Sequence, residues 1–220
     1  RPFANEIHHL SYGMVDLPSG KMKSREGTVV DADDLIAETI SECAAYTKES
    51  GKIDDIPTQE AELLFETLGL GALKYYLLKV DPKKRMLFNP QESIDLHGHT
   101  GPYIQYTHAR IKSILRKAEE LGIQASFEVN IIEPAERELA IVLASLDAKI
   151  KEASAELAPS VIANYVYDLA KTYNTFYNEL SILKENEPAK LQFRIALCTA
   201  TAAVIKACMK MLGIHVPERM

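Results

Sequence analysis

The chain has 220 residues, of which 47% are hydrophobic, and its formal net charge at pH 7 is -6. This length and hydrophobic share suffice for one large domain, or for a domain with a substantial appendage. The negative charge excludes proteins that hold nucleic acid through bulk positive charge, so such a site would have to be a local basic and aromatic patch. We find no apolar run long enough to span a bilayer and no signal peptide, and we expect no membrane partner.

The cysteines and histidines do not form a metal-binding pattern. Cys43, Cys198 and Cys208 are odd in number and lack metal-ligand spacing. Cys198 and Cys208 lie in an apolar helical run typical of buried thiols, which suits a reducing cytosol. His8-His9 and His97-Gly98-His99 have no nearby Cys or carboxylate set to complete a site. We therefore predict no metal site and a cytoplasmic location.

Residues 1–30 are predicted to form short strands and loops, because glycines and Pro18 interrupt them. The alternation from Ile7 onward is typical of a strand whose domain began upstream of Arg1, the alternative being a small domain that opens with an edge strand. In this region Lys21, Lys23 and Ser24 lie between glycines, a composition that suits a transient polyphosphate. The spacing is not that of a P-loop. From composition alone, an exposed basic loop without a ligand is the simpler interpretation.

From Asp31 onward the apolar spacing is helical almost throughout, so we predict a helical bundle over residues 31–220. Gly69 and Gly71 fall inside one predicted helix and indicate a kink or a helix–helix contact there. Residues 86–89 form a possible short strand. The predicted helices cover residues 31–50, 58–80, 103–121, 133–157, 159–183 and 188–212.

The helix over residues 103–121 has two different sides. Tyr103, Tyr106 and Arg110 fall at i, i+3 and i+7, which places two rings and a guanidinium on one face. Lys117 extends this face, which could stack unpaired bases and hold a phosphate. Tyr177, near the end of another helix, could present its phenol to solvent. From spacing alone, half-buried tyrosines beside solvated cations remain the alternative. The other side carries a core stripe of Ile104, Ile111, Leu115 and Ala118.

Several motifs together resemble the C-terminal portion of arginyl-tRNA synthetase, a class I aminoacyl-tRNA synthetase, over essentially the whole chain. The run Lys21-Met22-Lys23-Ser24-Arg25-Glu26-Gly27 is similar to a degenerate K-M-S-K-S loop. Thr100-Gly101-Pro102-Tyr103-Ile104-Gln105-Tyr106-Thr107-His108-Ala109-Arg110 matches the family's most recognisable block, and Pro217-Glu218-Arg219-Met220 matches its C-terminus. The block and the terminal E-R-M are jointly specific, whereas the loop alone is not.

The resemblance implies an all-α anticodon-binding domain over residues 101–220 and a helical connecting region over residues 31–100. Residues 1–30 would be a strand and loop remnant of a class I Rossmann-type catalytic domain. The implied reaction is ATP-dependent arginylation of tRNA, with Mg required by the full-length enzyme. The resemblance implies that Lys21, Lys23 and Ser24 stabilise the ATP phosphates. The implied contacts with the anticodon loop of tRNA(Arg) are Tyr103, Tyr106, Arg110, Lys117, Tyr177 and Met220.

Other parts of such an enzyme do not appear in this sequence. We find no H-I-G-H signature, arginine pocket or N-terminal domain for the tRNA elbow, so we expect these residues alone to be inactive. We expect them to bind tRNA weakly and to bind no cofactor, and we infer no protein partner. One alternative is a non-enzymatic RNA-binding helical module, which leaves the loop around Lys23 unexplained. The other is a helical protein-interaction domain with no role in nucleic-acid binding.

Overall fold

The computed structural model describes all residues except 1–6, 8, 18–19, 22–30 and 50–56. A small sheet lies near the N-terminal end of the chain, with β1 (Val15–Leu17) in its centre. β1 pairs antiparallel with β2 (Gly20–Lys21) and parallel with β3 (Met86–Leu87). The short strand predicted over residues 86–89 is therefore confirmed, and it returns the chain to the N-terminal segment.

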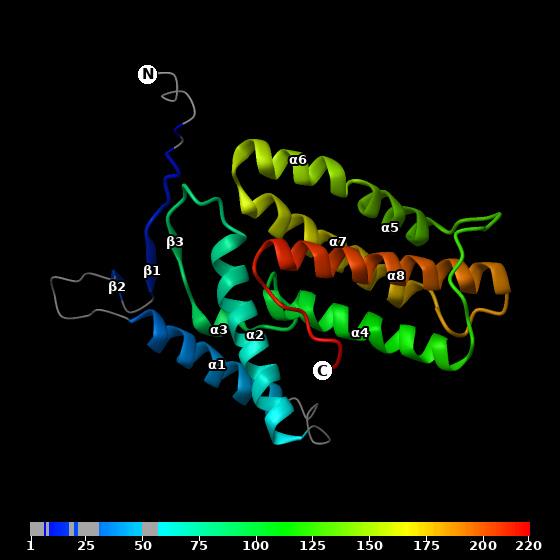
Figure 1. Cartoon of the computed structure of the whole chain (residues 1–220), viewed down its shortest axis with the longest axis horizontal. Coiled ribbons are helices and arrows are strands. Elements are labelled where there is room, and N and C mark those ends of the chain that lie inside the picture. The colour runs from blue at the N-terminus through cyan, green and yellow to red at the C-terminus, as the bar shows by residue number, and fades with distance from the viewer. Residues whose placement is uncertain (1–6, 8, 18–19, 22–30, 50–56) are drawn as a thin grey trace.

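Helices make up most of the remaining chain. Beside the sheet lie α1 (Ala32–Glu49), α2 (Thr58–Leu78) and the short α3 (Pro90–Ser93). Figure 1 shows α4, α7 and α8 running side by side, with α5 and α6 along their upper edge. The predicted all-α bundle after a short region of strands is confirmed. The bundle helices are α4 (Gly101–Glu120), α5 (Pro134–Ala144), α6 (Leu146–Glu156), α7 (Pro159–Glu179) and α8 (Pro188–Met211).

Local sequence explains where the bundle helices begin and end. A proline occupies the first turn of α4, α5, α7 and α8, where no intrahelical N–H bond is lost. The Thr100 hydroxyl accepts a hydrogen bond from the backbone N–H of Tyr103 at 3.2 Å and so caps α4. Gly122 and Gly213 follow α4 and α8 with φ of +69°, a conformation that favours glycine.

The single helix predicted over residues 133–157 is wrong, because two helices, α5 and α6, meet at Ser145. The Ser145 hydroxyl donates to the backbone carbonyl of Val142 at 2.7 Å. Such a local hydrogen bond competes with the helical ladder and favours a break. α6 then ends at Leu157, whose φ of 52° is left-handed.

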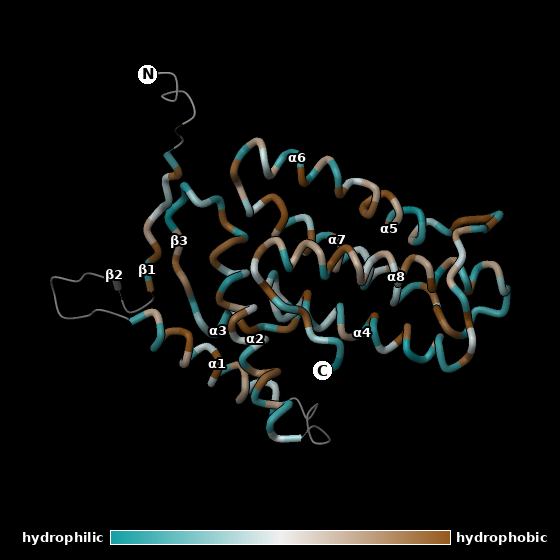
Figure 2. Tube along the Cα trace, viewed as in Figure 1, coloured by the Kyte–Doolittle hydropathy of each residue, from teal (hydrophilic) through white to brown (hydrophobic). Residues whose placement is uncertain are grey.

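The main core lies between α4, α5, α7 and α8, and the hydropathy colouring in Figure 2 shows brown stretches along α7 and α8. By length and composition α8 could span a membrane, so the expectation that no such run exists is wrong. The apolar side chains of α8 instead belong to the core, because 56% of its most apolar stretch is buried inside the bundle. The largest fully buried side chains of this core include Tyr173, Phe176, Ile104, Ile111, Leu139 and Ile205.

The predicted buried thiols are confirmed, because all three cysteines are buried and free. Burial raises the pKa of Cys43 and of Cys208 to about 11. These thiols therefore stay protonated at neutral pH and behave as small apolar core groups.

The glycines inside α2 mark a helix–helix contact, and α2 continues through them unbroken. A Cβ atom at Gly69 would lie 2.7 Å from Cγ1 of Ile40 in α1. A Cβ atom at Gly101, in the first turn of α4, would collide with the backbone carbonyl of Gly71. These small residues let α2 approach α1 on one side and the start of α4 on the other, which fixes the position of α4 against the N-terminal part.

Candidate nucleic-acid interface

Three of the predicted contact residues come together where α4 packs on α7. The guanidinium carbon of Arg110 lies 4.7 Å from the ring centroid of Tyr106 and 5.2 Å from that of Tyr177. These distances are within the range of a cation–π interaction. Tyr177 remains 39% exposed. The site therefore has an arginine held between two tyrosine rings, one of which reaches solvent.

Tyr103 lies on the same side of α4 but is held differently. Its ring centroid is 5.5 Å from that of Tyr167 in α7, so the ring is half-buried between helices. Its hydroxyl oxygen accepts a hydrogen bond of 2.8 Å from Nδ2 of Asn174. Tyr103 is therefore held more firmly between the helices than Tyr177, which is 39% exposed.

Asn174 connects Tyr103 and Arg110, and the sequence analysis did not identify it. Its Oδ1 accepts a hydrogen bond of 3.0 Å from Nη1 of Arg110. Its Nδ2 also donates to Oγ1 of Thr107 at 3.1 Å. Asn174 lies one turn before Tyr177 on α7, so a polar residue at i−3 from an exposed tyrosine was the available signal.

A pocket of about 490 Å³ opens beside the Arg110 sandwich, a size typical of small-ligand sites. Its wall combines Arg110 and Lys117 of α4 with Tyr177 of α7 and Lys184 of the following loop. No Asp or Glu is among the described residues that line it. Cations and an aromatic ring without a facing carboxylate suit an anionic, aromatic ligand such as a nucleotide.

Met220 does not join this group of residues. It packs partly buried against a separate cluster around Cys43, Leu64 and Leu68 of α1 and α2. The chain before it is held by side chains of α4, because Gln105 Nε2 donates to the His215 carbonyl at 2.7 Å and His108 Nδ1 to the Pro217 carbonyl at 2.8 Å. Burial lowers the pKa of His108, which favours its neutral form.

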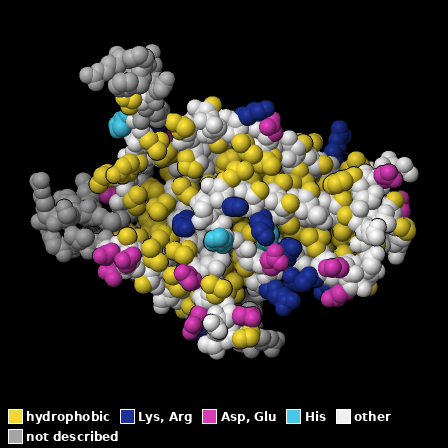
Figure 3. Space-filling model, in the orientation of Figure 1, with side chains coloured by type: hydrophobic (Ala, Val, Ile, Leu, Met, Phe, Trp, Pro, Cys, Tyr) yellow, Lys and Arg dark blue, Asp and Glu magenta, His cyan; other side chains and the backbone are white. Residues whose placement is uncertain are grey.

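Basic side chains also gather around this C-terminal segment. Figure 3 shows dark blue Lys and Arg side chains near the middle of the face, where the C-terminal segment crosses α4 in Figure 1. Lys112 Nζ and Lys206 Nζ lie 3.7 Å and 3.6 Å from Oε1 of Glu218. Their attraction overcomes the effect of desolvation and lowers the pKa of Glu218. These cations are already paired with a carboxylate, whereas those of the pocket beside Arg110 form no ion pair with any residue that the structure describes.

The predicted phosphate loop lies mostly outside the described residues. Lys21 ends β2, whose backbone pairs with β1 opposite Asp16. Lys23 and Ser24 belong to the range that is not described. Within the described ranges, no group of three or more His, Cys, Asp or Glu residues could hold a metal ion.

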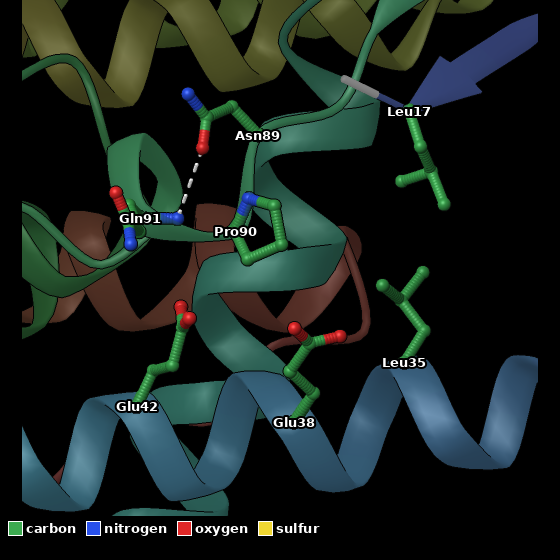
Figure 4. A pocket seen from close by; sticks show the side chains of 7 residues that line it. All are labelled: Leu17, Leu35, Glu38, Glu42, Asn89, Pro90 and Gln91. Carbon is green, nitrogen blue, oxygen red and sulfur yellow. Dashed lines mark hydrogen bonds between the residues drawn. The ribbon is translucent and has the colours of Figure 1, made fainter. Parts of the chain in front are cut away.

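A second hollow, of about 390 Å³, lies between α1 and the start of α3 (Figure 4). Glu38 and Glu42 project from α1 toward Asn89 and Gln91 across it. Burial, and then the neighbouring Glu38 charge, raise the pKa of Glu42. The two carboxylates that line this hollow repel anions, unlike the cations that line the pocket beside Arg110.

Comparisons with known proteins match the chain in two parts. The family model described as "DALR anticodon binding domain" matches residues 104–220, more than half of the chain. The model described as "tRNA synthetases class I (R), catalytic domain" matches residues 1–89.

Similar proteins match over essentially the whole chain. An arginine–tRNA ligase of Amoebophilus asiaticus is 52% identical over the whole chain, and one of Parabacteroides distasonis is 51% identical over 99% of it. The chain spans 38% and 37% of their lengths. The solved arginyl-tRNA synthetase of Thermus thermophilus has a TM-score of 0.85 at 31% identity, over 99% of this chain and 36% of that one. The Plasmodium falciparum arginyl-tRNA synthetase, at 22% identity and a TM-score of 0.75, shares the fold.

Proposed function

Because the chain belongs to the DALR anticodon binding domain family, and corresponds to the C-terminal portion of arginyl-tRNA synthetase, we propose that residues 101–220 bind the anticodon loop of tRNA(Arg). The observation that carries this proposal is the Arg110 guanidinium between the rings of Tyr106 and Tyr177, beside a pocket lined by cations. Unpaired bases stack on such rings, while the cations attract the phosphate backbone.

The roles of the contact residues follow from their exposure and chemistry. Tyr177, which is 39% exposed, would meet a base, and Tyr106 would hold the guanidinium beside it. Arg110 and Lys117 attract phosphates along the pocket wall. Tyr103 contributes its hydroxyl rather than its ring. Met220 would act at a distance from this pocket, through the cluster it forms with α1 and α2.

Replacing Tyr106 with alanine should weaken binding of a fluorescently labelled anticodon stem–loop of tRNA(Arg), measured by anisotropy. Tyr106 holds the Arg110 guanidinium rather than a base, so loss of this cation–π contact should cost about 0.5–2 kcal/mol, roughly 2- to 30-fold in the dissociation constant. Tyr12→Ala serves as a control, because Tyr12 is 86% exposed and lies in the N-terminal segment, outside the bundle. Unchanged affinity in Tyr106→Ala would favour the protein-interaction alternative over anticodon binding.

We further propose that the longer protein is a cytoplasmic arginine–tRNA ligase, in which residues 1–30 complete the ATP site. Lys21, Lys23 and Ser24 would stabilise the ATP phosphates electrostatically while the adenylate forms. The family match over residues 1–89 supports this assignment. Mg would be supplied with ATP, and no protein ligand for it is assigned. Residues 1–220 alone should show no arginine-dependent pyrophosphate exchange, because they carry no H-I-G-H signature.

The loop assignment is tested in a chimera that joins this chain to the preceding part of the Amoebophilus ligase, which is 52% identical to it. Replacing Lys21 and Lys23 together with alanine should lower the rate of ATP–pyrophosphate exchange by at least about tenfold. Binding of the labelled stem–loop should stay unchanged, because both lysines precede the residues that match the anticodon-binding family model, 104–220. An unchanged exchange rate would remove these lysines from the ATP site.

A further inference from the structure

Asn174 is the hub of a hydrogen-bond network whose directions can be assigned. Arg110 has donors and no acceptor, so the atom of Asn174 that faces it at 3.0 Å is the amide oxygen. The amide nitrogen then faces the Tyr103 hydroxyl at 2.8 Å and the Thr107 hydroxyl at 3.1 Å. The Thr107 hydroxyl donates to the Tyr103 backbone carbonyl at 2.9 Å, so it accepts from Asn174. All these hydrogen bonds agree with one orientation of the amide.

This orientation determines which hydrogens remain available. The Tyr103 hydroxyl oxygen accepts from Asn174, so its own hydrogen has no acceptor among the described residues. Arg110 uses Nη1 for Asn174, and its other N–H groups have no hydrogen-bond partner in the described part of the chain. The Tyr106 and Tyr177 ring centroids lie 4.7 Å and 5.2 Å from the guanidinium carbon, and these two rings hold the guanidinium beside Asn174.

We propose that Asn174 is a positioning residue that turns the Tyr103 hydroxyl and the Arg110 guanidinium edge into a paired hydrogen-bond donor for acceptor atoms of the bound RNA. These acceptors are phosphate oxygens or ring and carbonyl acceptors of a base, and a donor group of the RNA is not accepted there. The inference rests on the proposed anticodon-loop binding and adds a residue that touches the RNA only through its two neighbours.

The energetic consequence is coupling between Asn174 and Arg110. If Asn174 acts by orienting both donors, its amide has only the Tyr103 hydroxyl left to orient once the guanidinium is absent. If Asn174 only packs α4 against α7, its removal should reduce RNA affinity by the same factor with or without Arg110. A double-mutant cycle separates these two cases.

The cycle uses the labelled stem–loop of tRNA(Arg) with Asn174→Ala, Arg110→Ala and the double variant. Asn174→Ala should weaken binding about 5- to 20-fold in the wild-type background and only about 2- to 4-fold in the Arg110→Ala background, where the Tyr103 hydroxyl alone remains to be oriented. Equal losses in both backgrounds would overturn the proposal. If the wild-type chain does not bind the stem–loop at all, the proposed function fails instead, so the two failures are distinguishable.

Asn174→Asp provides a second test with the same side-chain shape. The carboxylate would hold Arg110 more tightly but neutralise its charge. It would also accept from the Tyr103 and Thr107 hydroxyls, so the Tyr103 hydrogen would no longer be available to the RNA. Binding should weaken, and the slope of log K against log salt should fall by about 0.7, one phosphate contact on a single strand. An unchanged affinity and slope would contradict the proposal.

Asn164→Ala is the matched control for folding. Asn164 lies on the same helix, and its Nδ2 donates to the carbonyls of Lys79 at 3.1 Å and Ser160 at 2.7 Å. Its removal should lower the melting temperature to an extent similar to that of Asn174→Ala while leaving stem–loop affinity unchanged. If Asn164→Ala weakens RNA binding as much as Asn174→Ala does, the effect reports general loosening of α7 and the proposal is overturned.

Discussion

Replacing Arg194 with methionine should lower the free energy of unfolding by about 3–5 kcal/mol, the range for removing one partner of a buried ion pair. The Arg194 side chain is 5% exposed, and its Nε lies 2.7 Å from Oε1 of Glu136, whose side chain is fully buried. Its Nη1 lies 2.9 Å from Oε2 of Glu185. Methionine fills a similar volume but leaves the Glu136 charge buried with no cation to compensate it.

The position of Glu136 increases the expected loss. Its other carboxylate oxygen accepts from the backbone N–H of Glu133 at 2.8 Å and so completes the capping box of α5. Nη1 of Arg194 also donates to the Ser181 carbonyl at 3.0 Å, in the loop that lines the Arg110 pocket. One guanidinium therefore joins the start of α5, the body of α8 and the wall of the candidate site.

Urea denaturation followed by circular dichroism measures the effect, with Lys151→Met as the control. Lys151 and Asp147 also form an ion pair, at 2.7 Å, but their side chains are 75% and 78% exposed. This exposed pair should contribute no more than about 1 kcal/mol. Similar losses in the two variants would show that the Arg194 network does not anchor α5 to α8.

Most of the helical architecture could be predicted from the sequence because its signals are local. Apolar spacing, prolines in the first turn and glycines after the last turn placed α4, α7 and α8 to within a few residues, and the family resemblance is confirmed. The break between α5 and α6 was not predicted. It depends on one serine bonding to a nearby carbonyl within a run that otherwise has helical character.

The candidate site could be predicted only in part, because it combines residues that are far apart in the sequence. Helical spacing brought Tyr106 and Arg110 to one face, and the structure adds Tyr177 from a helix far away in the chain. Asn174 escaped prediction because its hydrogen bonds cross between α4 and α7. Its place one turn before Tyr177 is a local signal, but that spacing does not identify the partners on α4. The position of Met220 likewise depends on how the last residues cross α4, which is a tertiary property.

Replacing Phe176 with alanine should lower the free energy of unfolding by about 3–5 kcal/mol, the usual cost of removing a buried aromatic ring. Phe176 is fully buried, and its ring centroid lies 5.8 Å from that of Tyr173 in the centre of the bundle. The surrounding helices α4, α7 and α8 are packed against one another, so they can relax only partly into the cavity that the ring leaves. Thermal or urea denaturation measures the loss.

Tyr177→Ala, at the next position on α7, should show the opposite combination of effects. Its ring is 39% exposed and stacks on the Arg110 guanidinium, so stability should fall by no more than about 1 kcal/mol. Stem–loop affinity should fall by roughly 5- to 150-fold, because the ring offered to a base is lost. At temperatures where Phe176→Ala remains folded, that variant should bind RNA like the wild type. If both variants lose affinity in proportion to their loss of stability, α7 contributes to binding only as a scaffold and Tyr177 makes no direct contact with the RNA.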